Sequence, residues 1–129
     1  MTWPVRAEPA NHYVWGDKCD GWRLVERERL SLREERIPPG GAEVAHFHKV
    51  AHQVFYVLSG ELTIRTPERT LLARPGEAVE IPPGVAHLVE NRGDADLRIL
   101  LYSSPDTAGD RHAVDPNLNG RSSDGAGDT

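Results

Sequence analysis

The stretch HFHKVAHQVFYVLSG, residues 46 to 60, places three histidines and a glutamine within eight positions and then continues as an apolar segment. In a β-strand, residues i and i+2 point to the same face, so His46 and His48 are expected to project together. Two neutral imidazoles on one rigid face suit a divalent first-row metal. Such a pair alone is as typical of a protein surface as of a metal site, so further ligands must come from elsewhere.

A second informative stretch is GEAVEIPPGVAHLVEN, residues 76 to 91. A glycine turn opens a short strand, and Pro82-Pro83-Gly84 then predicts a tight turn. His87 follows at the start of the next strand, and Asn91 lies four residues further on. Pro82, Gly84 and Asn91 are interpreted as structural residues, which leaves His87 as the candidate ligand.

The rest of the chain predicts an all-β fold. The segments between residues 42 and 102 are short, rich in Val, Ile, Leu, Tyr and Phe, and bounded by turn residues: AEVAHFH, QVFYVLS, ELTIRT, TLLA, EAVEI, AHLVEN and DLRILLY. Residues 12 to 27 read as two further strands. Residues 29 to 37 begin with apolar alternation and end at PPGG, which favours a strand over a short helix. Regular spacing with no helical period indicates a sandwich or small barrel.

Composition limits the classes of function. With 129 residues the chain is expected to form one domain with one hydrophobic core. A net charge of −5, with charges of both signs interspersed, argues against a nucleic-acid partner. No signal peptide and no apolar run long enough for a membrane span are seen. A single cysteine, Cys19, excludes an internal disulfide and suggests a reducing, cytoplasmic location.

The predicted organisation has three parts. Residues 1–11 form an N-terminal arm, residues 12–103 the barrel, and residues 104–129 a flexible C-terminal tail. The tail sequence is rich in Gly, Asp, Ser and Pro and carries few large apolar residues, so it has little surface to bury. Its removal is therefore expected to leave the melting temperature nearly unchanged, and His112 within it is expected to be solvated.

The two motifs together resemble those of the cupin superfamily of double-stranded β-helix (jelly-roll) barrels. The first motif, a glycine, five residues, HxH, three or four residues, an acidic ligand, six residues and a glycine, is represented from Gly40 to Gly60. The second, from Gly76 through PxG and His87 to Asn91, matches at every fixed position. The resemblance implies a single-domain cupin barrel and, since dimers are common among cupins, a homodimer.

The resemblance also implies a ligand set, with one departure from the family pattern. His46, His48 and His87 occupy the three histidine positions, while Gln53 stands where the family usually has glutamate. Strand parity does not choose between His52 and Gln53, because both faces of the following strand are apolar. The six-residue count back from Gly60 favours Gln53. A neutral amide should leave the metal its full charge, raising Lewis acidity and lowering affinity.

These residues predict a function only in outline. The expected cofactor is a divalent transition metal (Mn, Fe, Zn, Ni or Co), and the expected partner is a small organic molecule, with Phe55 and Val57 lining its pocket. The leading hypothesis is a metal-dependent enzyme of dioxygenase, isomerase, decarboxylase or cyclase type. The alternative is a non-catalytic binding or sensing module. No catalytic acid or base is assigned, because the glutamate usual at position 53 is replaced by glutamine. Glu34, Glu35 and Arg36 are interpreted as solvated charges, one of which could reach the barrel mouth.

Overall fold

The computed structural model describes residues 3–118, which consist almost entirely of antiparallel β-strands. A short 3-10 helix, η1 (Pro9–Asn11), precedes the strands. The strands are β1 (His12–Trp15), β2 (Cys19–Glu26), β3 (Ser31–Ile37), β4 (His46–Phe47), β5 (His52–Ser59), β6 (Leu62–Arg65), β7 (Thr70–Ala73), β8 (Ala78–Ile81), β9 (Leu88–Glu90), β10 (Leu97–Ser104) and β11 (His112–Ala113). This confirms the predicted all-β class.

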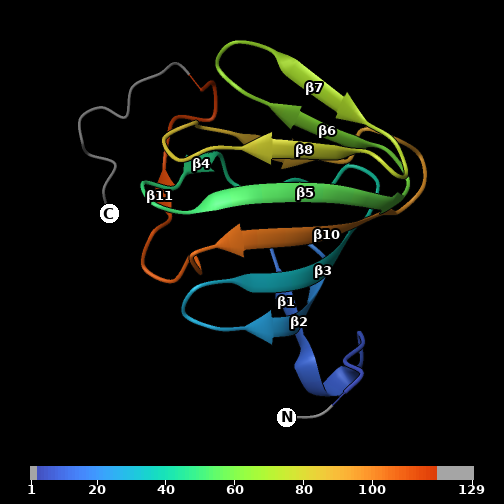
Figure 1. The fold of residues 1–129 in the computed structure, drawn as a ribbon. Coiled ribbons are helices and arrows are strands. Elements are labelled where there is room, and N and C mark those ends of the chain that lie inside the picture. The colour runs from blue at the N-terminus through green and yellow to red at the C-terminus, as the bar shows by residue number, and fades with distance from the viewer. Residues whose placement is uncertain (1–2, 119–129) are drawn as a thin grey trace.

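The strands form a large and a small sheet, with a short ribbon beside them (Figure 1). The large sheet has the order β1-β2-β3-β10-β5-β8, and the small sheet has the order β7-β6-β9. Strands β4 and β11 pair with each other although they lie far apart in the sequence. Neighbours such as β10 and β3 are not consecutive along the chain, which is the crossed connectivity of a jelly roll.

Alternation along each strand determines which side chains face the interior. In β5, Gln53, Phe55 and Val57 are buried, while Tyr56 is exposed. In β10, Leu97 and Ile99 are fully buried; Ile99 pairs with the buried Val57 of β5, and Leu97 pairs with the buried Ile37 of β3. These residues join a single apolar core with buried side chains from several other strands, including Cys19, Ile37, Leu62, Ile64, Ala73, Ile81 and Val89.

The glycine that ends the first motif has a steric role. Gly60 has φ of +85°, a conformation that side-chain-bearing residues rarely adopt. A Cβ at this position would lie 2.5 Å from the carbonyl oxygen of Asp96 and 2.8 Å from Cα of Leu97. Gly60 therefore allows the turn after β5 to pass close to the start of β10.

The segment after residue 103 was predicted to be a flexible tail, but its described part packs against the barrel. Strand β11 pairs with β4, and the ring of His112 lies 5.1 Å from that of Phe47 rather than in open solvent. Leu118 is 4% exposed and joins a small apolar cluster with Ala45 and Leu88. The packed chain thus extends beyond residue 103, because polar main-chain contacts replace the large apolar residues that this segment lacks. The remainder of the predicted tail, residues 119–129, lies outside the described residues.

Among residues 3–118 there is no helix long and apolar enough to cross a lipid bilayer.

Candidate metal centre

The two motifs meet at a main-chain bridge between their histidines. The amide N–H of His46 donates to the carbonyl of His87 at 3.1 Å, and the amide N–H of His87 donates back to His46 at 2.9 Å. The turn glycine Gly84 donates to the carbonyl of His48 at 2.7 Å. Because directly paired residues carry their side chains on the same face, this bridge brings the histidines of both motifs together.

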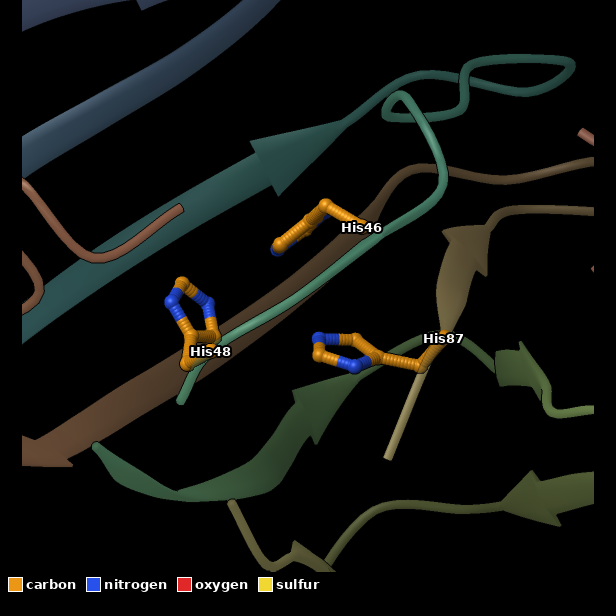
Figure 2. Close-up of side chains that lie close together, drawn as sticks. All are labelled: His46, His48 and His87. Atoms are coloured by element: carbon orange, nitrogen blue, oxygen red, sulfur yellow. The ribbon is translucent and has the colours of Figure 1, made fainter. Parts of the chain in front are cut away.

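The three imidazoles converge in the interior of the barrel (Figure 2). One possible ligand atom from each of His46, His48 and His87 lies within 4.8 Å of the others, and all three residues are buried. The rings of His46 and His87 are 4.6 Å apart between centroids, and those of His46 and His48 are 4.9 Å apart. Three histidines so arranged form a donor set that fits a first-row transition metal.

Hydrogen bonds to main-chain carbonyls orient each ring. Nδ1 of His46 lies 2.7 Å from the carbonyl of Val44, and Nδ1 of His87 lies 2.9 Å from that of Val85. Nδ1 of His48 lies 2.7 Å from the carbonyl of Asp110. A carbonyl only accepts, so each Nδ1 carries the hydrogen and each Nε2 keeps its lone pair, as metal-binding histidines require.

Burial keeps these imidazoles neutral. It lowers the pKa of His46 to about 2, with the neighbouring His87 as the next cause, and it lowers the pKa of His87 to about 4. The pKa of His48 is lowered as well, again mainly by burial. Nε2 of His48 and Nε2 of His87 are buried without a hydrogen-bond partner among the described residues. Unsatisfied buried nitrogens of this kind are costly, and a bound metal would satisfy them.

The structure also distinguishes Gln53 from His52. Gln53 is 4% exposed and lines the same cavity as His46 and His48. Its Nε2 donates to the hydroxyl of Ser103 at 3.1 Å, and its Oε1 is buried without a partner among the described residues. The side chain of His52 is 45% exposed, and its Nε2 lies 2.6 Å from a carboxylate oxygen of Glu80. The inward position therefore belongs to Gln53, while its role as a ligand stays a prediction.

The cavity beside the histidines has a volume of about 140 Å³. Phe55 lines it, whereas Val57, which the sequence also predicted in the pocket, is completely buried in the apolar core and is absent from the described lining. Whether Phe55 contacts a bound molecule stays a prediction. The lining residues are Tyr13, Trp15, Arg33, Glu35, Glu43, His46, His48, Gln53, Phe55, Leu101, Thr107 and Arg111.

Two carboxyl groups in this cavity were not assigned from the sequence. Glu35, interpreted as solvated, is only 8% exposed, and Glu43 was not singled out at all. Burial raises the pKa of Glu35 to about 7, and burial together with Glu35 raises that of Glu43 to about 8. A usable signal existed for Glu35, since it shares strand parity with the buried Ile37. Glu34, on the other face, pairs with Arg98 as a partly exposed charge should.

The C-terminal segment completes the site. The carboxylate of Asp110 accepts hydrogen bonds from the main-chain N–H groups of residues 49, 50 and 51 at 2.8–3.0 Å. Burial alone would raise the pKa of Asp110, but these hydrogen bonds outweigh it and the pKa is lowered. The carbonyl of the same residue orients His48, and the neighbouring Arg111 places its Nη2 3.4 Å from Nδ1 of His46.

Comparison with known proteins places the chain in a family. The cupin domain family matches residues 33–102, which is more than half of the chain. The chain is 28% identical over 69 residues to the tetracenomycin polyketide synthase protein TcmJ of Streptomyces glaucescens, covering 54% of this chain and 46% of TcmJ. It is also 28% identical over 77 residues to an oxalate-binding protein of Thermotoga maritima, covering 60% and 63% of the two chains.

A solved structure supports the same relationship. The polyketide cyclase RemF from Streptomyces resistomycificus superimposes with a TM-score of 0.71 and 25% identity, over 82% of this chain and 81% of RemF. The matched region spans between about half and three-fifths of the length of the curated relatives named above. From the family match, the jelly-roll topology and both motifs, the chain belongs to the cupin family.

Proposed function

We propose that this cupin holds a divalent first-row metal through His46, His48 and His87, with Gln53 as a fourth ligand. The metal would then bind a small molecule through oxygen atoms, and the protein would act on that molecule. The observation that supports this most directly is the set of buried, unsatisfied acceptors that line or adjoin one cavity: Nε2 of His48, Nε2 of His87 and Oε1 of Gln53.

The chemistry of the site follows from its ligands. A bound divalent metal supplies Lewis acidity, which polarises a carbonyl or carboxylate oxygen. Three neutral imidazoles and a neutral amide would leave that charge undiminished, whereas the more usual glutamate would offset part of it. The main-chain carbonyls that hold Nδ1 of each histidine fix the donor directions, and Phe55 restricts the space available to water.

The cavity size narrows the substrate class. A volume of about 140 Å³ resembles the cavity of about 150 Å³ that is known to accommodate benzene. A small dicarbonyl or dicarboxylate compound would fit inside, and a larger molecule would place a single ring there and leave the rest outside. The relatives are named for polyketide chemistry and for oxalate, both rich in oxygen donors suited to a hard or borderline metal.

The second candidate is a binding module that holds such a compound without converting it. The Thermotoga relative, named for oxalate binding, favours this alternative. The cytoplasmic location and the homodimer inferred from the sequence stay predictions under either function.

The test is metal analysis of protein purified without chelator, followed by exchange for Co²⁺, whose visible spectrum reports its ligands. We expect one metal per chain and a spectral change when oxalate or acetylacetone is added. Dioxygen uptake and product analysis with enediol and diketone compounds then separate an enzyme from a binding module. Protein that takes up no metal, or a spectrum insensitive to both compounds, would contradict the proposal.

A further inference from the structure

A carboxyl–phenol pair lies in the wall of the cavity outside both cupin motifs. The hydroxyl of Tyr13 on β1 donates to Oε2 of Glu35 on β3 at 3.0 Å, and both residues line the cavity that contains His46 and His48. Between them lies Gly21, the cross-strand partner of both. A Cβ on Gly21 would come within 2.2 Å of the Tyr13 ring, so a glycine is needed for the phenol to reach Glu35.

We propose that Glu35 is the catalytic base of this site, removing a proton from the carbon next to a carbonyl of the bound molecule, with Tyr13 as its positioning residue. The inference rests on the proposed function, because the substrate is held by the metal-binding half of the cavity. The family usually has a glutamate at position 53, which could serve as an acid or base, but this chain has glutamine there. Glu35 would supply that acid–base group instead.

Glu35 suits this role better than the other buried carboxyl. Oε2 of Glu43 lies 3.9 Å from Nδ1 of His46, so Glu43 is tied to the orientation of a candidate ligand. Glu35 is instead held by a phenol whose own pKa is raised by burial and by Glu35, which keeps Tyr13 protonated as a hydrogen-bond donor.

The charged and titratable groups that influence Glu35 come from every side of it. Tyr13 donates to it, Arg33 and Arg111 oppose the effect of burial, and Glu43 and the buried thiol of Cys19 feel its negative charge. Burial outweighs both guanidinium groups, so the pKa of Glu35 is raised to about 7. A base with a pKa near the working pH is both available as carboxylate and strong enough to accept a carbon-bound proton.

The proposed step is balanced without any further reactant. The C–H bond next to the carbonyl breaks, its proton moves to the Glu35 carboxylate, and its electron pair forms a C=C bond. The carbonyl π pair moves onto the oxygen, giving an enolate. The proton on the Glu35 carboxylic acid then exchanges with solvent, and a solvent-derived proton returns from this carboxyl to the same carbon, which regenerates the starting ketone. In D₂O the step is therefore observable as deuterium incorporation.

The substrate class is a small ketone that carries a second oxygen donor adjacent to the carbonyl. Such a compound can chelate a metal through two oxygens and still present an acidic C–H bond. Pyruvate and hydroxyacetone meet both conditions and are small enough for a cavity of about 140 Å³.

The experiment follows deuterium incorporation into the methyl group of pyruvate and into carbon-bound hydrogens of hydroxyacetone, by NMR in D₂O with metal-loaded protein. We expect exchange above the rate with metal alone, and a fall of the catalysed rate on the order of 100-fold or more in Glu35→Gln. The wild-type rate should increase with pH through about 7 as Glu35 loses its proton, and level off roughly one pH unit above that value. Tyr13→Phe should retain part of the activity and shift this profile.

Glu34→Gln is the matched control, because Glu34 is on the same strand and its carboxylate lies 3.0 Å from Nη2 of Arg98. A ¹³C NMR titration of the metal-free protein gives a second readout, in which a carboxyl titrating near pH 7 should be missing from Glu35→Gln. Exchange that is unchanged in Glu35→Gln, or absent from wild type although a probe binds, overturns the assignment of Glu35. Failure of both probes to bind would overturn the substrate class. The proposed function is tested separately, by metal content and by oxalate binding.

Discussion

The cavity has two walls of different origin. One, the motif wall, comprises His46, His48 and Gln53, with His87 clustered against the two histidines; the other, the flanking wall, comprises Tyr13, Glu35, Glu43 and Arg111. The motif wall is assembled by direct main-chain pairing between two recognisable sequence motifs. The flanking wall draws its polar groups from the first strands, the loop before β4 and the C-terminal segment. The difference shows that a family motif can locate the histidine cluster of a site while leaving the buried carboxyl groups beside it unassigned.

The strongest way to separate the two walls is to remove the histidines. We expect the triple substitution of His46, His48 and His87 by alanine to give a folded β protein that has lost most of its divalent metal. The flanking wall should persist, so Glu35 and Glu43 should still titrate well above an ordinary glutamate. Metal analysis after dialysis, circular dichroism and NMR titration test this. Stoichiometric metal in the triple variant would show that the motif wall is not the binding site.

The next largest effect should come from the C-terminal segment that joins the walls. The three main-chain N–H groups bound by the Asp110 carboxylate lose their partner in Asp110→Ala. We expect the free energy of unfolding to fall by about 2 kcal/mol, since hydrogen bonds to charged groups are stronger than neutral ones.

Truncation after Ser103 should lower the free energy of unfolding by at least as much, and the melting temperature with it, contrary to what the sequence alone predicts. Denaturant unfolding measures the free energy for both variants and thermal unfolding the melting temperature, with Asp94→Ala in an exposed turn as the control. An unchanged melting temperature after truncation would restore the view that this segment does not support the barrel.

Substitution of Gln53 by glutamate places a carboxylate in the motif wall, which otherwise has only neutral candidate ligands. The added negative charge should tighten divalent metal binding, on the order of tenfold. Oε1 of Gln53 is buried without a partner among the described residues, so the corresponding oxygen of the new carboxylate would be free to bind a metal. Competition with a metal chelator measures the dissociation constant. Unchanged affinity would argue against a ligand at this position.

The pH dependence of stability should report the flanking wall by itself. The folded-state pKa values of Glu35 and Glu43 are raised to about 7 and 8, so the unfolded chain binds fewer protons in this range. Stability of the metal-free protein should therefore fall as pH rises from about 6.5 to 8, by roughly 1 kcal/mol per pH unit. The histidines, whose folded pKa values are lowered, act in the opposite direction, and their effect fades between about pH 6.5 and 7.5 as the unfolded chain loses its imidazole protons. The double variant Glu35→Gln/Glu43→Gln should flatten the curve above pH 6.5.

The smallest effect is expected for His52→Ala. Its imidazole faces outward and contacts only the exposed carboxylate of Glu80 in the described hydrogen bonds, an arrangement that contributes little to stability. Metal content should be unchanged, and the free energy of unfolding should change by less than about 0.5 kcal/mol. Loss of metal in this variant, but not in Gln53→Ala, would show that the fourth ligand is His52 and not Gln53.

Much of the fold could be predicted because it depends on short-range patterns. Apolar alternation and turn residues indicated the strands, and the motif spacing indicated which histidines would meet. The choice of Gln53 over His52 came from a residue count, and the buried position of Gln53 agrees with it. Val57 was placed in the pocket on parity alone. Parity gives the face of a sheet but not the depth along it, so Val57 lies in the core instead.

Local periodicity and motif spacing in the sequence were enough to predict the barrel strands and the histidine ligand candidates. Which residues form the flanking wall depends on the tertiary structure. Glu35 shares strand parity with the buried Ile37, but parity alone does not predict that a charged side chain is buried; Glu35 is enclosed because Gly21 admits the ring of Tyr13, whose hydroxyl donates to Glu35. Asp110 and Arg111 contact residues that lie 59 to 65 positions away in the sequence. The Asp110 carboxylate accepts from main-chain N–H groups, and Nη2 of Arg111 lies 3.4 Å from Nδ1 of His46. Contacts between segments so far apart follow from neither local periodicity nor motif spacing.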